Sequence, residues 1–404
     1  MTHSIRLTVG APAHGGHCIA RHEGRAVFVR GGLPGEVVQA RVDDPAADAR
    51  FWNAEVTEVL EASPDRVEHP WPEAAVGGVG GAELGHVALP AQREWKLAVV
   101  RESLSRFAGI DYEGDVRAAP GDDERGGLRY RTRVSATAGE DGRATMAVPG
   151  SGVRHTLKRM PLAVQEAEEA LLATKTEPGQ LIEVATTAFG ETYVSLGKGD
   201  PTLLTETVTV GDRSFAYALR AGEFWQVHRE APAVLLGEVM RLVGDAPRVL
   251  DLYSGAGLFA VPFAAEGRDV TAVELAGTHS KGKSSLQQNL RGYPGATAVA
   301  GDTRRTVAAM AAADQDWSRG AVVLDPPRSG AKAATIEAIT SLEPARIVYV
   351  ACDPVALGRD AKTLAAAGYV VEEIQSFDLF PMTHHIETIA TFARKIANMA
   401  VSVG

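Results

Sequence analysis

Alternating apolar and polar residues fill the first part of the chain. Four short runs show this alternation, at residues 5–9, 26–29, 36–42 and 54–60, and glycine-rich turns separate them. A period of two residues is typical of strands with one buried face. Several such strands in so short a segment predict a small β-barrel of the OB type over residues 1–62.

The pattern is mixed over residues 63–220. A linker rich in proline and glycine comes first, and residues 91–107 then have the spacing of an amphipathic helix. We expect Trp95, Val99 and Leu104 to lie on one side of this helix. Strand-like segments dominate the remainder, so we predict a central, mostly β domain.

Helix and strand patterns alternate over residues 221–404. The apolar strand segments are residues 248–253, 269–274, 321–325 and 346–352. This alternation predicts a parallel sheet covered by helices. We therefore expect an α/β fold, with a C-terminal Rossmann-like domain, an N-terminal small β-barrel and the central β domain.

Composition and charge narrow the class of protein. Apolar residues make up 45% of the chain, and no stretch is long and apolar enough for a membrane span or a signal peptide. Only Cys18 and Cys352 are cysteines, which fits a reducing compartment. We expect a cytoplasmic protein that acts as a monomer, with no membrane partner.

The net charge of −10 argues against non-specific binding of polyanions, so any such contact needs a local basic patch.

Polar residues end the four predicted strands of the C-terminal domain. They are Asp251, Glu274, Asp325 and Cys352. Open α/β sheets bind their ligands beyond the carboxyl ends of the strands, so these side chains predict one site.

Cys352 stands between a predicted strand and a predicted helix. Asp353 is a good N-cap and Pro354 a good first helical residue. The dipole of the helix should lower the pKa of the thiol there and make it a nucleophile. A lone cysteine is more commonly a buried structural residue, so Cys352 alone does not establish a catalytic nucleophile.

A glycine turn follows the first strand of that domain. Asp251 leads into Gly255 and Gly257, which let the chain turn tightly beside a ligand. The spacing differs from the dinucleotide pattern, and with Glu274 ending the next strand it suits S-adenosylmethionine better. A nucleotide-binding dehydrogenase is the alternative that this motif leaves open.

Two later motifs carry further chemistry. Asp325 opens a Pro-Pro-Arg-Ser-Gly segment, in which two prolines give a rigid exit from the strand. Glu387 follows His384 and His385 at the start of an apolar strand and could act as a general base. The two histidines would point to opposite faces of a strand, so we predict no metal site.

Together these motifs give a family resemblance over nearly the full chain. Segments 16–24 and 27–36 resemble the TRAM domain of the RNA uridine-5-methyltransferases, an RNA-binding barrel, and segments 130–134 and 224–228 resemble the middle region of that family. Segments 251–257, 325–330, 351–354 and 380–387 are similar to its catalytic motifs, in order and spacing.

The resemblance implies a role for individual residues. Cys352 would be the nucleophile and Glu387 the base. The residues implied to bind S-adenosylmethionine are Gln226, Asp251, Tyr253, Gly255, Gly257, Glu274, Asp302 and Asp325. RNA is the implied partner, and we expect Arg129, Arg131 and Arg133 to bind it, although charge alone fits a solvated hairpin face equally well.

One departure concerns an iron–sulfur cluster that several family members hold through four cysteines. Trp71, Val79, Ala82 and Met160 stand at the corresponding places, so we predict no cluster. His228 and Asp353 stand where asparagine is common in the family, which could alter the site.

The implied reaction is methylation of carbon 5 of a uridine in RNA, with 23S rRNA favoured over tRNA. A methyltransferase acting on an exocyclic amine and an RNA-binding protein without catalysis are the alternatives. Arg328 stands where an amine methyltransferase usually has an aromatic residue.

Overall fold

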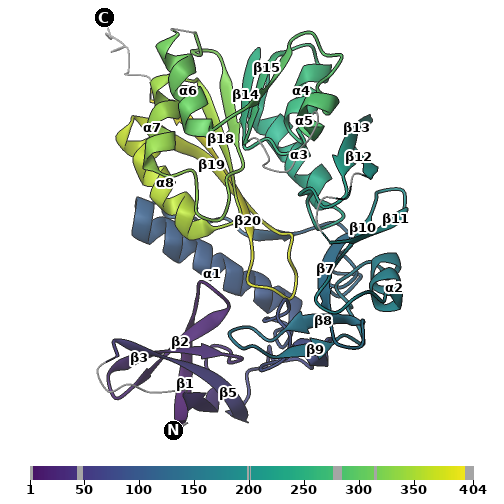
Figure 1. The fold of residues 1–404 in the computed structure, drawn as a ribbon. Coiled ribbons are helices and arrows are strands. Elements are labelled where there is room, and N and C mark those ends of the chain that lie inside the picture. Colours follow the sequence, from purple (N-terminus) through teal and green to yellow (C-terminus); the bar gives the residue numbers. More distant parts are fainter. Residues whose placement is uncertain are drawn as a thin grey trace, which may run out of the picture.

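The computed structural model describes residues 3–42, 49–197, 200, 202–275, 284–313 and 316–395. Three β-rich parts follow one another along the chain, with a long helix between the first and the last of them (Figure 1). None of the helices in the described ranges has the length and apolar character needed to cross a membrane.

The first part is a closed five-stranded barrel, as the sequence predicts. Its strands are β1 (His3–Ala13), β2 (His17–His22), β3 (Arg25–Arg30), β4 (Val37–Val42) and β5 (Phe51–Glu61), in the order β1-β2-β3-β5-β4. Alternate residues such as Leu7 and Val9 point into the barrel and are almost completely buried. Closure leaves no open sheet edge in so small a unit.

Helix α1 (Leu89–Ala108) lies between the barrel and the C-terminal domain (Figure 1). Trp95 and Val99 pack into the barrel core, whereas Val100 and Leu104 pack into the core of the C-terminal domain. The prediction that Leu104 shares a side with Trp95 is therefore wrong. The two residues are nine positions apart, which at 3.6 residues per turn puts them on opposite sides of the helix.

The central part is a five-stranded sheet with one helix and a separate hairpin. The sheet has the order β11-β10-β7-β8-β9, and the hairpin pairs β12 with β13. The bounds are β7 (Arg133–Ala138), β8 (Ala144–Ala147), β9 (Arg154–Thr156), α2 (Gln165–Ala173), β10 (Leu181–Thr186), β11 (Thr192–Leu196), β12 (Leu203–Val210) and β13 (Arg213–Arg220); a short 3-10 turn, η1 (Pro72–Ala74), precedes α1.

The four residues that the sequence analysis matched to cluster cysteines come together in this central part. Trp71, Val79, Ala82 and Met160 are each at most 5% exposed and belong to one apolar core with Tyr130. Apolar side chains thus fill the space among these four positions. Packing of this kind stabilises the region through burial of apolar surface.

The C-terminal sheet has eight strands in the order β16-β15-β14-β17-β18-β20-β19-β6. The bounds of its strands and helices are β6 (Val116–Ala118), α3 (Ala231–Val243), β14 (Arg248–Leu252), α4 (Ala260–Ala265), β15 (Asp269–Glu274), α5 (Ser285–Asn289), β16 (Ala296–Ala300), α6 (Thr303–Ala312), β17 (Ala321–Leu324), α7 (Ala333–Ser341), β18 (Arg346–Ala351), α8 (Pro354–Ala366), β19 (Tyr369–Asp378) and β20 (Glu387–Arg394).

Helices cover both faces of this sheet, as expected for a Rossmann-like domain. Along β18, Val348 and Val350 face one apolar core, while Ile347 and Tyr349 face the other. Strands β14 to β18 are parallel, and β20 runs antiparallel between β18 and β19.

The edge strand β6 comes from far upstream in the chain. It pairs in parallel with β19, although it lies within the stretch 63–220 that the sequence analysis assigns to the central domain. Together with α1, it ties this upstream segment to the C-terminal sheet. The division at residues 62 and 220 stays a prediction.

Candidate active site

The carboxyl ends of five parallel strands bring the predicted polar residues to one edge of the sheet. Asp251 lies in β14, Glu274 ends β15, and Asp302, Asp325 and Cys352 follow β16, β17 and β18. The ends of the short apolar strands therefore determine where these residues lie. The structure places them at the edge where open α/β sheets bind ligands.

Glu387 reaches the same edge because β20 runs in the opposite direction. Thr388 pairs with Ala351, so Glu387 at the start of β20 lies beside Cys352 at the end of β18. Glu387 is 5% exposed, and within the described ranges its Oε2 has no hydrogen-bond partner. Burial and the nearby Asp325 raise the pKa of Glu387 well above its usual value, and Arg328 opposes this shift.

Cys352 lies directly before α8, as predicted, and Asp353 caps that helix by accepting a hydrogen bond from the Ala356 amide at 2.8 Å. The prediction of a lowered thiol pKa is wrong for this structure. Burial, followed by the charges of Glu387 and Asp325, raises the pKa of Cys352 to about 12. The side chain of Asp353 takes up an amide of the helix end and adds its own negative charge, so the dipole does not dominate.

The glycine turn after β14 leaves space beside its backbone. Gly255 and Gly257 have φ values of 54° and 93°, and Tyr253 has a φ of 61°. A Cβ added to Gly255 would meet no atom within 4 Å. The Gly255 amide donates to Glu274 at 2.8 Å, which holds the turn against the end of β15. This arrangement fits a ligand that approaches the backbone closely.

Asp251 is the most deeply buried acid of this edge. It is fully buried, and neither carboxylate oxygen has a hydrogen-bond partner in the described part of the chain. Burial raises the pKa of Asp251 to about 8 and that of Asp325 to about 7. Buried acids without partners are costly, and a cationic ligand that donates hydrogen bonds would relieve that cost. Their environment therefore fits the sulfonium and amino groups of S-adenosylmethionine.

Two of the predicted cofactor residues have different surroundings. Asp302 is exposed and caps α6 by accepting a hydrogen bond from the Arg305 amide at 2.9 Å. Gln226 is buried beside another cavity, of about 510 Å³, which Thr132 and His228 also line. Binding of the cofactor by these two residues stays a prediction.

A small cavity of about 90 Å³ opens onto Cys352. Arg328, His384 and His385 line it, and so does His14 from the turn after β1 in the barrel. The sequence analysis missed His14. The glycines that follow it indicate a turn but give no sign that the turn reaches a strand end more than three hundred positions away.

The arginines predicted to bind RNA differ in their surroundings. Arg129 forms an ion pair with Glu168 of α2, and Arg133 forms one with the buried Glu206 of β12. Arg131 lies against the ring of Tyr130 and lines a cavity of about 420 Å³. The strongly basic character expected of this segment is thus partly neutralised, because its acidic partners come from later segments.

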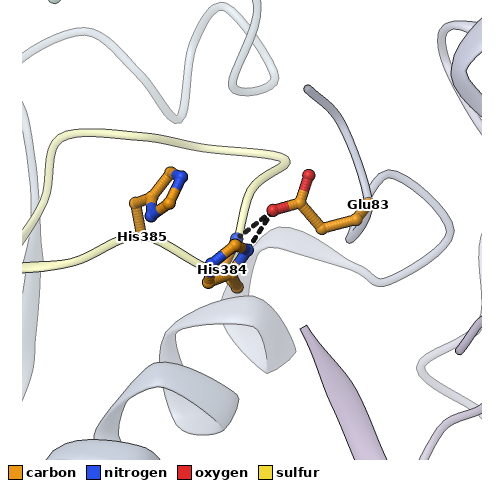
Figure 2. Close-up of side chains that lie close together, drawn as sticks. All are labelled: Glu83, His384 and His385. Atoms are coloured by element: carbon orange, nitrogen blue, oxygen red, sulfur yellow. Dashed lines mark hydrogen bonds and ion pairs between the residues drawn. The ribbon is translucent and has the colours of Figure 1, made fainter. Parts of the chain in front are cut away.

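His384 and His385 lie in the loop before β20 rather than within a strand. Their ring centroids are 4.1 Å apart, so the expectation that they point to opposite faces is wrong. Figure 2 shows His384 beside Glu83, which comes from the segment before α1. The backbone amide of His384 also donates to Glu83, at 3.2 Å.

The geometry of the sheet and its edge defines a Rossmann-like methyltransferase fold, and comparison with known proteins agrees with it. Residues 4–47 match the TRAM domain, and residues 297–395 match the family described as tRNA (Uracil-5-)-methyltransferase. The chain is 39% identical to an uncharacterized RNA methyltransferase of Bifidobacterium longum, over 94% of each chain.

Two further similarities span almost the whole molecule. The 23S rRNA (uracil(1939)-C(5))-methyltransferase RlmD of Halomonas elongata is 30% identical over 95% of this chain and 88% of its own length. The structure of Pyrococcus abyssi tRNA (uracil-54, C5)-methyltransferase in complex with S-adenosyl-L-homocysteine has the same fold, with a TM-score of 0.69 at 19% identity, over 96% of this chain and 99% of that one. The chain belongs to the S-adenosylmethionine-dependent RNA (uracil-5-)-methyltransferase family.

Proposed function

We propose that this protein methylates carbon 5 of a uridine in 23S rRNA through a covalent bond between Cys352 and carbon 6 of the uracil. The pairing of β18 with β20 carries the proposal, because it sets Glu387 beside Cys352 at the ligand-binding edge. The TRAM domain and the similarity to the Halomonas elongata 23S rRNA enzyme support ribosomal RNA as the substrate.

Each of the two side chains has one role in the proposed reaction. Cys352 loses its thiol proton to solvent, and its sulfur forms a bond to carbon 6, so that the electron pair of the ring double bond makes carbon 5 nucleophilic. S-adenosylmethionine would supply the methyl group to carbon 5 and leave as S-adenosylhomocysteine. Glu387 then removes the hydrogen of carbon 5 as a proton, the double bond forms again, and the sulfur leaves carbon 6.

The electrostatics of this sheet edge support a dependence of the proposed reaction on bound ligands. Asp251, Glu274 and Asp325 would hold the cofactor. The charges of Glu387 and Asp325 add to burial in disfavouring a thiolate at Cys352 until they are balanced. The high pKa of Glu387 makes it a stronger base once it has lost its proton. A uridine must also leave its stack to enter a cavity of this kind.

The apolar core around Met160 supports the further proposal that this protein works without an iron–sulfur cluster. Two cysteines in the whole chain cannot supply a four-cysteine site, and one of them, Cys18, lies in the barrel core. The packing of Trp71, Val79 and Ala82 would then stabilise this region in place of a cluster.

Trapping of the covalent intermediate tests the chemistry. Wild-type protein with cofactor and a 23S rRNA transcript containing 5-fluorouridine should give an adduct that survives denaturing gels. Cys352→Ala should give none, whereas Cys18→Ala, which changes the other cysteine, should still give it. Glu387→Gln should accumulate the adduct on ordinary uridine, because the carbon 5 proton stays in place. Methylation by Cys352→Ala at the wild-type rate would disprove the proposal.

Nucleoside mass spectrometry tests the substrate. Ribosomal and transfer RNA from cells with and without the protein are digested and compared for 5-methyluridine. Loss from 23S rRNA alone supports the proposal, and loss from tRNA alone assigns the same chemistry to a different RNA.

A further inference from the structure

Three side chains with metal-binding atoms converge beside the Cys352 cavity. Glu83 comes from the segment before α1, and His384 and His385 come from the β19–β20 loop. One possible ligand atom of each lies within 4.8 Å of the other two, and all three residues are half-buried (Figure 2). Two imidazoles and a carboxylate form a donor set typical of Zn²⁺ sites.

We propose that Glu83, His384 and His385 bind a divalent transition metal ion such as Zn²⁺. Three protein ligands leave a fourth position open in tetrahedral geometry. His384 and His385 also line the cavity that holds Cys352, so the ion would lie next to the candidate active site. It would link the segment before α1 to the loop that leads into Glu387.

Neighbouring residues contact the backbone and side chains of the proposed ligands. The Thr383 hydroxyl accepts a hydrogen bond from the His385 amide at 3.3 Å. Gly16 brings the barrel against the site, since a Cβ there would lie 2.9 Å from Cγ of Glu83 and 3.4 Å from Cβ of His384. Such outer contacts orient ligands and strengthen metal binding.

Arg328 is the group that competes with the ion. Its Nη2 lies 3.1 Å from Nε2 of His385, and because a guanidinium only donates, this nitrogen accepts from it. A bound ion would replace this contact, and the charge of Arg328 would oppose it. The proposal therefore predicts that replacing a ligand weakens metal binding, whereas replacing Arg328 strengthens it.

Metal titration of the untagged full chain tests this inference without RNA or cofactor. Zn²⁺ binding is measured by calorimetry, and Co²⁺ binding by the visible absorption of tetrahedral Co²⁺. Glu83→Gln, His384→Gln and His385→Gln should each weaken binding by at least about tenfold. Arg328→Gln should tighten it. His155→Gln removes an exposed histidine of β9 and should leave it unchanged.

The outcomes separate a metal site from a hydrogen-bonded Glu83–His384 pair. Glu83→Gln keeps the size of the side chain, and its thermal unfolding shows whether the fold is intact. Absence of saturable binding by the wild type at millimolar Co²⁺ would overturn the inference. Equal weakening by His155→Gln would also overturn it, because surface histidines would then account for the signal.

Discussion

Nε2 of His14 in the barrel lies 3.2 Å from Oδ2 of Asp353 at the start of α8. This contact joins the TRAM domain to the residue that follows Cys352. The hydrogen bond that His14 donates to Asp353 raises the pKa of His14. Burial alone would raise the pKa of Asp353, but the hydrogen bond with His14 lowers it. The turn after β1 of the barrel therefore lines the cavity beside Cys352, and its contact with Asp353 depends on pH.

The first prediction concerns this pH dependence. The ordinary pKa of histidine is 6.5, and His14 has a higher value in the folded protein, so the stabilisation is complete below pH 6.5 and is lost as pH rises through the folded value. Because His14 is 43% exposed, we expect less than about 1 kcal/mol. Thermal unfolding of wild type and His14→Gln should differ most at pH 5.5 to 6.5 and converge by pH 8. A difference that grows with pH would contradict this assignment.

The second prediction concerns the reactivity of Cys352. With a pKa of about 12, the ligand-free thiol should react with iodoacetamide at pH 8 about two to three orders of magnitude more slowly than a free cysteine. Arg328 lowers this pKa, so Arg328→Gln should slow the reaction further. The rate is measured in a Cys18→Ala background by intact-protein mass spectrometry.

Paired ligands provide the control for this experiment. S-adenosylmethionine carries a methyl group and a positive charge on its sulfur, whereas S-adenosylhomocysteine lacks both and is otherwise the same molecule. Only the first should accelerate alkylation of Cys352, because it balances the nearby acids. Equal rates with both ligands would show that the charge of the cofactor does not reach the thiol.

Local sequence patterns predicted the framework of the site. The positions of Asp251, Glu274 and Cys352 follow from where apolar strands stop, and Asp353 and Pro354 start a helix by local chemistry alone. Such features need only neighbouring residues, so the sequence is sufficient to find them. The roles of these residues in binding and catalysis stay predictions.

Contacts between distant segments could not be read in this way. The partner of Arg133 is Glu206, seventy-three positions later, and nothing near either residue indicates the pair. The strand β6 is three residues long and pairs with β19, and α1, which comes before β6 in the chain, packs against α8 of the same domain. Burial is the main cause of the raised pKa of Cys352, and the charges of Glu387 and Asp325, which come from other segments of the chain, add to it.

The third prediction concerns a buried ion pair at the base of the β19–β20 loop. Lys96 of α1 is completely buried, pairs with Asp378, and donates to the Phe380 carbonyl at 3.0 Å. Lys96→Met leaves a buried carboxylate without its partner, which should cost about 3–5 kcal/mol of unfolding free energy. Adding Asp378→Asn should recover part of that loss. Urea unfolding measures both, and a single variant as stable as wild type would contradict the pairing.

The fourth prediction separates two arginines of the central domain. Arg131 lines a cavity, so Arg131→Gln should weaken RNA binding and reduce its salt dependence by about one phosphate contact. Arg133 neutralises the buried Glu206, so Arg133→Gln should mainly lower the free energy of unfolding. Filter binding at several salt concentrations and urea unfolding distinguish the two effects. If instead Arg133→Gln weakens RNA binding and Arg131→Gln lowers stability, Arg133 rather than Arg131 belongs to the RNA-binding surface.

The fifth prediction concerns the apolar core around Trp71, Val79, Ala82 and Met160. Met160 is 5% exposed and packs with Trp71 and Val79, so Met160→Ala leaves a cavity and should cost about 2–5 kcal/mol. Phe189→Ala is the control, because Phe189 is 72% exposed and its loss should change stability by less than about 0.5 kcal/mol. If packing alone supports this region, iron chelators should leave the unfolding of both variants and of wild type unchanged. A chelator that destabilises the wild type would show that a metal centre contributes there after all.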